Sequence, residues 1–136
     1  MLPAVRSFPL RCSYDIVQAR QYARETAREM GFSLTDQTRF ATAVSEIARR
    51  VLDDGDEGSL RFALVVSGSR RGLECVCLGS PWRHDAAAPA SRGLLSGVER
   101  LVDDFELAPG GKEGLLVLRK WLPLARPASL QAPRPV

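Results

Sequence analysis

The sequence has few of the residues that mark specialised classes of protein. It contains three cysteines and one histidine, and no apolar run approaches the roughly 20 residues of a membrane-spanning helix. An odd number of cysteines without regular spacing argues against a disulfide framework, and Cys-x-Cys alone does not supply the four ligands of a zinc site. We therefore expect reduced, buried thiols at Cys75 and Cys77, no metal site and a cytoplasmic protein.

The chain also lacks a strong excess of charge of either sign. Nineteen Lys and Arg oppose sixteen Asp and Glu, which leaves a net charge of +3 and a pI near 9.1. This small excess is spread along the chain, so neither nucleic acid nor a membrane is expected as a partner. With 136 residues, 45% of them apolar and 26% charged, the chain fits one ordinary globular domain.

Hydrophobic periodicity predicts two long helices near the start of the chain. The first is capped by Ser13 or Asp15 and runs to about Met30, and the second is capped by Ser33 or Thr35 and ends at about residue 52. Apolar residues three or four apart form the expected buried stripes, namely Ile16, Ala19, Ala23, Ala27 and Met30 on the first helix and Phe40, Val44, Ile47, Ala48 and Val51 on the second.

The other expected elements are strands and one short helix. Strands are predicted at residues 7–13, 60–67, 73–78, 105–108 and 115–121, with Trp121 in the core, and a helix at residues 93–102. Hairpins favour antiparallel pairing, which predicts an α/β fold: a two-layer sandwich of a mixed, largely antiparallel sheet covered on one face by about three helices. Residues 1–122 would form this domain, and the proline-rich segment 123–136 would be a disordered tail.

Five stretches in the same order and similar spacing, spanning about residues 10–122, resemble one known family. They are YDIVQARQ at 14–21, EMGFSLTDQT at 29–38, ATAVSEIAR at 41–49, GVERLVDDF at 97–105 and RKWL at 119–122. Together they resemble the RsbT-type switch kinases of bacterial stress signalling, which belong to the histidine-kinase-like ATPase (GHKL) superfamily. The resemblance implies an α/β sandwich that binds ATP and magnesium between sheet and helices. It also implies phosphorylation of a serine or threonine on a STAS-domain protein, and exchange between that scaffold and a phosphatase or anti-sigma partner.

The first part of the implied site lies on the second long helix. Glu46 matches the family's glutamate, which orients or deprotonates the attacking hydroxyl group. Arg50 stands one turn later, where the family has a magnesium-binding asparagine. A guanidinium group has five donors and no acceptor, so it cannot bind the ion. We expect Arg50 to pair with Glu46, or alternatively to contact a phosphate.

The second part is the family's Asp-x-Gly-x-Gly motif, whose aspartate accepts a hydrogen bond from the adenine amino group. The matching stretch here is LGSPW at 78–82. Leu78 falls at the position of the aspartate and cannot accept a hydrogen bond, while Gly79 remains as a residue that could approach the base. Trp82 would fill space that the purine needs, and we expect it to be a core or lid-covering aromatic residue.

The third part is the family's glycine-rich lid around the triphosphate, represented here by ASRGLLSG at 90–97. Only Gly93 and Gly97 remain of its glycines. These remnants, with Arg50 and Gly79, are the candidate cofactor-binding residues, and Glu46 is the candidate general base. Because all three parts are altered together, the sequence predicts a closed nucleotide pocket.

The resulting hypothesis is a partner-switching regulator in bacterial stress or sigma-factor signalling that has no kinase activity and binds no cofactor. Its partners would be a STAS-domain antagonist or scaffold, or a PP2C-type phosphatase. One alternative is an active ATP-dependent serine/threonine kinase that uses ATP and magnesium to phosphorylate a STAS-domain protein. Another is a subunit that forms a homodimer, or a heterodimer with a related ATPase-fold protein.

Overall fold

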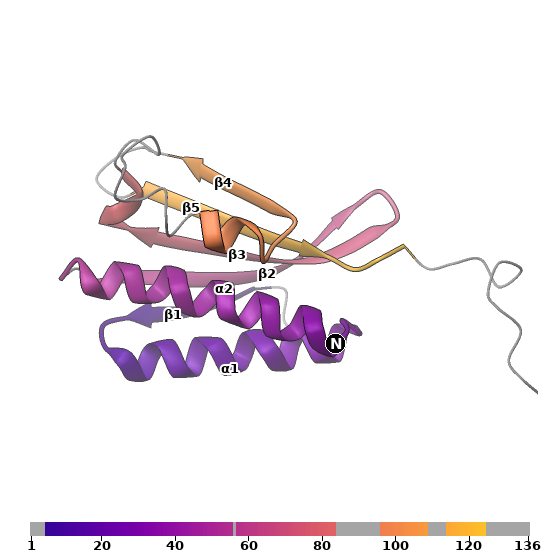
Figure 1. Ribbon diagram of the computed structural model, residues 1–136, viewed down its shortest axis with the longest axis horizontal. Helices are drawn as coiled ribbons and strands as arrows, with labels where there is room; N and C mark the ends of the chain where they lie inside the picture. The colour runs from indigo at the N-terminus through magenta and orange to yellow at the C-terminus, as the bar shows by residue number, and fades with distance from the viewer. Residues whose placement is uncertain (1–4, 56, 84–95, 109–113, 125–136) are drawn as a thin grey trace, which may run out of the picture.

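The computed structural model describes residues 5–55, 57–83, 96–108 and 114–124 of the chain (Figure 1). In chain order the elements are β1 (Val5–Leu10), α1 (Ser13–Met30), α2 (Leu34–Asp53), β2 (Gly58–Ser67), β3 (Arg70–Gly79), the 3-10 helix η1 (Ser80–Arg83), β4 (Asp104–Ala108) and β5 (Gly114–Trp121). Residues 96–99 are also helical. The predicted order of strands and helices is therefore confirmed within the described residues.

The strands form one five-stranded sheet in the order β1-β2-β3-β5-β4. All four neighbouring pairs are antiparallel. The sequence predicted a mixed, largely antiparallel sheet, whereas the observed sheet is antiparallel throughout. β2 and β3 form a tight hairpin at Gly68, whose φ of +60° is a conformation that glycine adopts without strain. β4 lies at the edge of the sheet, and β5 lies between β4 and β3. The last two strands therefore extend the sheet on the β3 side.

α1 and α2 lie on the same face of the sheet, which makes the two-layer sandwich (Figure 1). The predicted stripes are buried on both helices, except that Met30 is half-buried at the end of α1. α1 begins after Cys12, and the Asp15 carboxylate accepts hydrogen bonds from the backbone N–H groups of Arg11 and Cys12, at 2.8 and 3.3 Å. α2 begins after Ser33, whose hydroxyl oxygen accepts from the Asp36 N–H at 3.1 Å. Ser33 and Thr35 were the two residues predicted to cap α2, and Ser33 is the one that does so.

The core lies between the helices and the sheet face that carries alternate residues of β2, β3 and β5. Four aromatic rings, those of Phe8, Tyr22, Phe40 and Phe62, form a cluster there, with Phe62 in contact with each of the other three. The buried aliphatic and thiol side chains of the sheet surround it: Leu60, Leu73, Cys75, Cys77, Leu116 and Leu118.

Trp121 is not in this core, contrary to the prediction. It pairs with Gly72 and lies half-buried on the opposite face of the sheet. Its Nε1–H donates to Asp104 Oδ2 at 2.7 Å, and the Arg70 guanidinium lies 4.7 Å from its ring centroid. Successive strand residues point to opposite faces, so the core-facing position at this end of β5 belongs to Lys120.

Two of the predicted segments lie largely or wholly outside the described residues. These are the first part of the lid, up to residue 95, and the proline-rich tail from residue 125 onward. All the strands in the described part of the chain belong to one sheet. None of the helices in the described ranges is long and apolar enough to cross a lipid bilayer.

Candidate functional site

The first two parts of the implied nucleotide site, on α2 and at the end of β3, lie where α2 ends and β3 leads into η1, at the left of Figure 1. η1 packs against α2, β4 and β5 at this end of the molecule. The second half of α2 supplies Glu46 and Arg50, and the end of β3 supplies Gly79. The fold therefore brings these sequence-predicted residues to one region.

Glu46 and Arg50 do not form the expected ion pair. Glu46 is exposed, whereas Arg50 is half-buried, and the Arg50 Nε atom lies 3.7 Å from Asp54 Oδ1. Asp54 is one turn beyond Arg50 and follows the last residue of α2. An arginine in the last turn of a helix also interacts favourably with the free carbonyl groups there, which gives Arg50 a structural role.

Gly79 has a packing role that explains why this position has no side chain. A Cβ atom added to Gly79 would lie 2.8 Å from Val51 Cγ2, and one added to Gly58 would lie 2.9 Å from Val51 Cγ1 and would clash with the Leu78 carbonyl oxygen. Real Cβ atoms do not approach other atoms this closely. The two glycines on β2 and β3 thus allow α2 to lie directly against the sheet, and Val51 fills the space beside Gly79.

Trp82 is a core residue, in agreement with the prediction. Its side chain is 2% exposed, and its Nε1–H donates to Cys77 Sγ at 3.3 Å. It belongs to the same buried core cluster as Val51, and η1, which carries it, packs against α2 and β5. A bulky indole is thereby held where the resemblance places the nucleotide base.

Leu78, which the resemblance matches to the motif's aspartate, lies on the face of the sheet away from the helices. It pairs with Ser59 on β2 and with Leu115 on β5, and it is half-buried. The residue of this strand end that faces the helices is Cys77, because neighbouring residues of a strand point to opposite faces. The hydrogen-bonding atom at this position is consequently a thiol, not a carboxylate.

The two thiols of β3 are neutral at physiological pH. Burial raises the pKa of Cys77 to about 12, and burial together with nearby Cys77 and Glu74 raises the pKa of Cys75 well above its ordinary value. Thiolates bind metals and act as nucleophiles, whereas neutral buried thiols behave as small apolar groups. Among the described residues, no group of His, Cys, Asp and Glu side chains is arranged to hold a metal ion.

The raised thiol pKa values predict a loss of stability in alkaline solution. Below pH 9.0 Cys77 is protonated in both states, but above this pH it ionises in the unfolded chain and stays protonated in the folded one up to about pH 12. The unfolded state then binds fewer protons, so the free energy of unfolding should fall by about 1.4 kcal/mol per pH unit for each such thiol. Urea denaturation between pH 8 and 10.5 in reducing buffer would measure this slope. Cys77→Ala should make it shallower.

The lid positions are only partly described. Gly93 lies outside the described residues. Gly97 lies in the helical segment 96–99 and is exposed, and a Cβ atom added to it would have no neighbour within 4 Å. Packing therefore does not explain Gly97. Val98, the next residue, is 1% exposed and fixes this helical segment to the core.

Sequence reasoning missed a charged cluster at the opposite end of the molecule. The Lys120 ammonium is almost completely buried and lies 3.4 Å from Asp36 Oδ1 and 3.9 Å from Asp103 Oδ1. A hollow of about 670 Å³ opens beside it. The position of Lys120 could have indicated this cluster. Lys120 follows Leu118 by two residues on the same strand, so both side chains point to the core face. Its carboxylate partners stabilise a cation that the sheet would otherwise bury alone.

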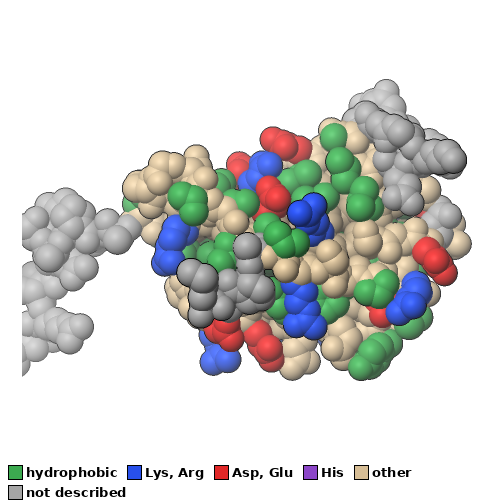
Figure 2. All heavy atoms as spheres, turned by 180° about the vertical axis from the view of Figure 1, so that it is seen from behind, with side chains coloured by type: hydrophobic (Ala, Val, Ile, Leu, Met, Phe, Trp, Pro, Cys, Tyr) green, Lys and Arg blue, Asp and Glu red, His purple; other side chains and the backbone are tan. Residues whose placement is uncertain are grey.

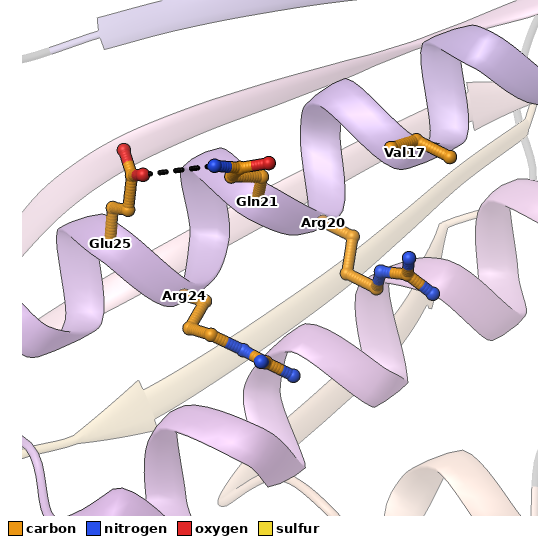
Figure 3. A pocket seen from close by; sticks show the side chains of 5 residues that line it. All are labelled: Val17, Arg20, Gln21, Arg24 and Glu25. Carbon is orange, nitrogen blue, oxygen red and sulfur yellow. Dashed lines mark hydrogen bonds between the residues drawn. The ribbon is translucent and has the colours of Figure 1, made fainter.

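A second hollow, of about 330 Å³, lies on the surface of α1 (Figure 3). Its lining side chains all come from this one helix. Arg20 and Arg24 point in the same direction, and Gln21 Nε2–H donates to Glu25 Oε1 at 3.2 Å on the other side. Val17, which also lines the hollow, and Tyr14 are exposed apolar residues. The outer face of α1 thus combines exposed apolar groups with two arginines one turn apart.

Comparison with known proteins places this structure in a family. No protein-family model matches the chain. The chain is 33% identical over 120 residues to the serine/threonine-protein kinase RsbT of Bacillus subtilis (strain 168), a match that covers 80% of this chain and 90% of that protein. The structure resembles the RsbU and RsbW domains of Rv1364c from Mycobacterium tuberculosis, with a TM-score of 0.64 and 17% identity over 90% of this chain. The chain spans 34% of that longer protein, and this likeness concerns the fold. With its α/β sandwich and its extended match to RsbT, the chain belongs to the RsbT-type kinases of the GHKL superfamily, a family of partner-switching regulators.

Proposed function

We propose that this RsbT-type protein is a partner-switching regulator in bacterial stress or sigma-factor signalling that does not itself transfer phosphate. The observation that carries the proposal is the packing of Val51 and Trp82 at the end of α2 and β3. Val51 lies against Gly79, and Trp82 is 2% exposed. A nucleotide base would have to displace both side chains, at the cost of core packing.

The polar groups near this packing also fit ATP and magnesium poorly. Cys77 Sγ already accepts the Trp82 N–H, and its neutral thiol is a weak acceptor for an adenine amino group. Arg50 offers no oxygen to magnesium, and it pairs with Asp54. These residues do not supply the contacts that the resemblance implies, which supports binding without catalysis.

The outer face of α1 is the surface that we assign to partner binding. Tyr14 and Val17 are 66% and 44% exposed, and Arg20 and Arg24 extend beside them (Figure 3). Protein interfaces commonly combine aromatic and aliphatic contacts with arginine. The partner proposed for this face is a STAS-domain protein or a PP2C-type phosphatase, as in the family resemblance.

An active serine/threonine kinase is the second candidate, and one observation favours it. Glu46 is exposed on α2, and among the described residues no ion pair or hydrogen bond occupies its carboxylate. A carboxylate of this kind is free to accept a proton from a hydroxyl group. The chain's relative is named a serine/threonine-protein kinase, and under this alternative ATP and magnesium would bind beside Glu46.

Thermal melting with ATP and magnesium distinguishes the two candidates. We expect the melting temperature to stay unchanged at millimolar nucleotide, because Trp82 and Val51 fill the site. A binding protein at a hundredfold excess over its dissociation constant would gain about 2.7 kcal/mol, a rise of several degrees. The B. subtilis relative serves as the positive control.

A rise that disappears on chelation or in Glu46→Ala would support the kinase and contradict the proposal. Pull-down with purified STAS-domain and PP2C-type proteins from the same cell then tests the partner. Retention of either one is expected. Retention of neither, with retention of a related ATPase-fold protein instead, would favour the dimerising subunit.

A further inference from the structure

The hollow of about 670 Å³ beside Lys120 collects charged and apolar side chains from separate parts of the chain. Its volume lies within the range of roughly 300–1,000 Å³ that is usual for ligand sites. Figure 2 views the molecule from behind, and at its left end, where β5 finishes, it shows basic side chains beside hydrophobic ones. We call this feature the Lys120 hollow, and its lining residues are Asp36, Arg39, Arg70, Asp103, Asp104 and residues 120–124.

The carboxylates of the Lys120 hollow are already used to hold the protein's own groups. Asp103 Oδ2 accepts the backbone N–H of Trp121 at 2.7 Å, and Asp104 Oδ2 accepts the indole N–H of the same residue at 2.7 Å. Asp36 lies between two cations, 3.4 Å from Lys120 Nζ and 3.7 Å from Arg39 Nη1. The acidic side chains therefore have little capacity left for a ligand.

The cations of the Lys120 hollow, in contrast, keep unused donors. The Arg70 guanidinium lies 4.7 Å from the Trp121 ring centroid, and within the described ranges no carboxylate pairs with it. Arg39 is 53% exposed on its side chain, and its contact with Asp36 is long. Both ion-pair distances of Lys120 also exceed the roughly 2.8 Å of a charged hydrogen bond. Since a guanidinium has five N–H donors, the hollow offers more donors than acceptors, which favours an anionic ligand.

The distribution of these cations favours an extended ligand over a small anion. Arg39 comes from α2, Arg70 from β3 and Lys120 from β5, so one small ion cannot satisfy all three. Apolar groups lie among them: Leu124 is 63% exposed, and the Trp121 ring is half-buried. Surfaces that bind proteins commonly combine Arg and Trp with aliphatic contacts. The ligand that fits has carboxylates and apolar side chains on one segment.

The part of the chain that follows the Lys120 hollow does not supply such carboxylate side chains. Residues 125–136 include Arg126 and Arg134 and contain no Asp or Glu. We propose that the Lys120 hollow binds an acidic segment of a partner protein, with its carboxylates at Arg39 and Arg70 and its apolar side chains against Trp121 and Leu124. The proposal is independent of nucleotide binding and of the α1 surface.

The two tryptophans of the chain provide a local readout for this proposal. The Trp121 indole lines the hollow, whereas the Trp82 indole is buried at the opposite end of the molecule. Full-length ¹⁵N-labelled protein would be titrated with the end-blocked peptide Leu-Glu-Asp-Leu, and the two indole N–H signals, assigned with Trp121→Phe, would be followed by NMR. We expect the Trp121 signal to shift and saturate while the Trp82 signal stays in place. The matched peptide Leu-Gln-Asn-Leu should bind at least about fivefold more weakly, because it lacks the charges.

Variants of the two arginines test which side chains bind the peptide. Arg39→Gln and Arg70→Gln should each raise the peptide dissociation constant about two- to fivefold, which is the usual effect of losing an exposed ion pair, and the double variant should raise it about tenfold. Arg49→Gln, another exposed arginine of α2, is the matched control and should leave the constant unchanged. Thermal melting of each variant shows whether it is folded, and exposed substitutions of this kind should change stability little.

Several outcomes would overturn the proposal. Equal affinity for the acidic and the amide peptide, or for the unaltered protein and the double variant, would show that carboxylates do not bind at the arginines. A Trp82 signal that moves together with the Trp121 signal would place binding elsewhere. An equal Trp121 shift with inorganic phosphate alone would indicate a small-anion site. A Trp121 shift that depends on protein concentration without peptide would make a second copy of the chain the occupant.

Discussion

Trp82→Ala should destabilise the protein by about 3–5 kcal/mol, because it removes a fully buried indole from the end of the core. The ring is 2% exposed and closes the space between α2 and the sheet. Its loss would leave a cavity in this part of the core, and it would also remove the only donor hydrogen-bonded to Cys77 Sγ among the described residues. The loss of dispersion contacts and apolar burial adds to this missing hydrogen bond.

Urea denaturation monitored by circular dichroism would measure the effect. Trp82→Phe is the matched control, since it keeps an aromatic ring in the core and removes the N–H group; it should cost less than half as much as the alanine change. A loss below about 1 kcal/mol in Trp82→Ala would mean that the indole does not fill the core in solution. In that case the packing argument for a closed nucleotide site would also fail.

Phe40→Ala should cost about 3–5 kcal/mol as well, for a different reason. Phe40 is 1% exposed and lies in the middle of α2, with its ring 6.4 Å from that of Phe62 in an edge-to-face arrangement. It joins the helical layer to the aromatic cluster on the sheet. Edge-to-face pairs add about 0.5–1.5 kcal/mol beyond the area that they bury.

The same denaturation experiment would compare Phe40→Ala with Phe40→Leu. The leucine variant keeps most of the volume and should lose about 1–2 kcal/mol. Thr42→Ala, at an exposed position of the same helix, controls for helix propensity and should change stability by less than about 0.5 kcal/mol. Equal losses in the alanine and leucine variants would show that ring contacts, and not filled volume, hold this part of the core.

The helices could be predicted closely because their information is local. Apolar residues at three- and four-residue spacing set the buried stripes of α1 and α2, and Ser33 before Asp36 set the start of α2. The capping of α1 was less predictable, because the Asp15 carboxylate bonds backward to the N–H groups of Arg11 and Cys12. Several side chains near a helix start can accept these donors, and the surrounding packing selects one.

The strands could be located from sequence, but the face that each residue occupies could not. A change of one residue in register moves every side chain to the other face of a sheet. For this reason the prediction of Trp121 in the core is wrong, and Lys120 occupies the core-facing position. The local signal for this parity is weak, because β3 and β5 carry apolar residues on both faces, and Glu74 and Arg119 mark the face away from the helices.

The amino-acid sequence by itself determined the fold class, the order of the elements and the family, since these depend on residue types and spacing. Only the tertiary structure decided that Val51 fills the space beside Gly79, that Trp82 bonds to Cys77, and that Arg50 pairs with Asp54. It also placed Arg61 on β2 and Glu106 on β4 on opposite sides of the paired residues Val76 and Val117. Such contacts join residues far apart in the chain, so they depend on how helices and strands pack and not on any local pattern.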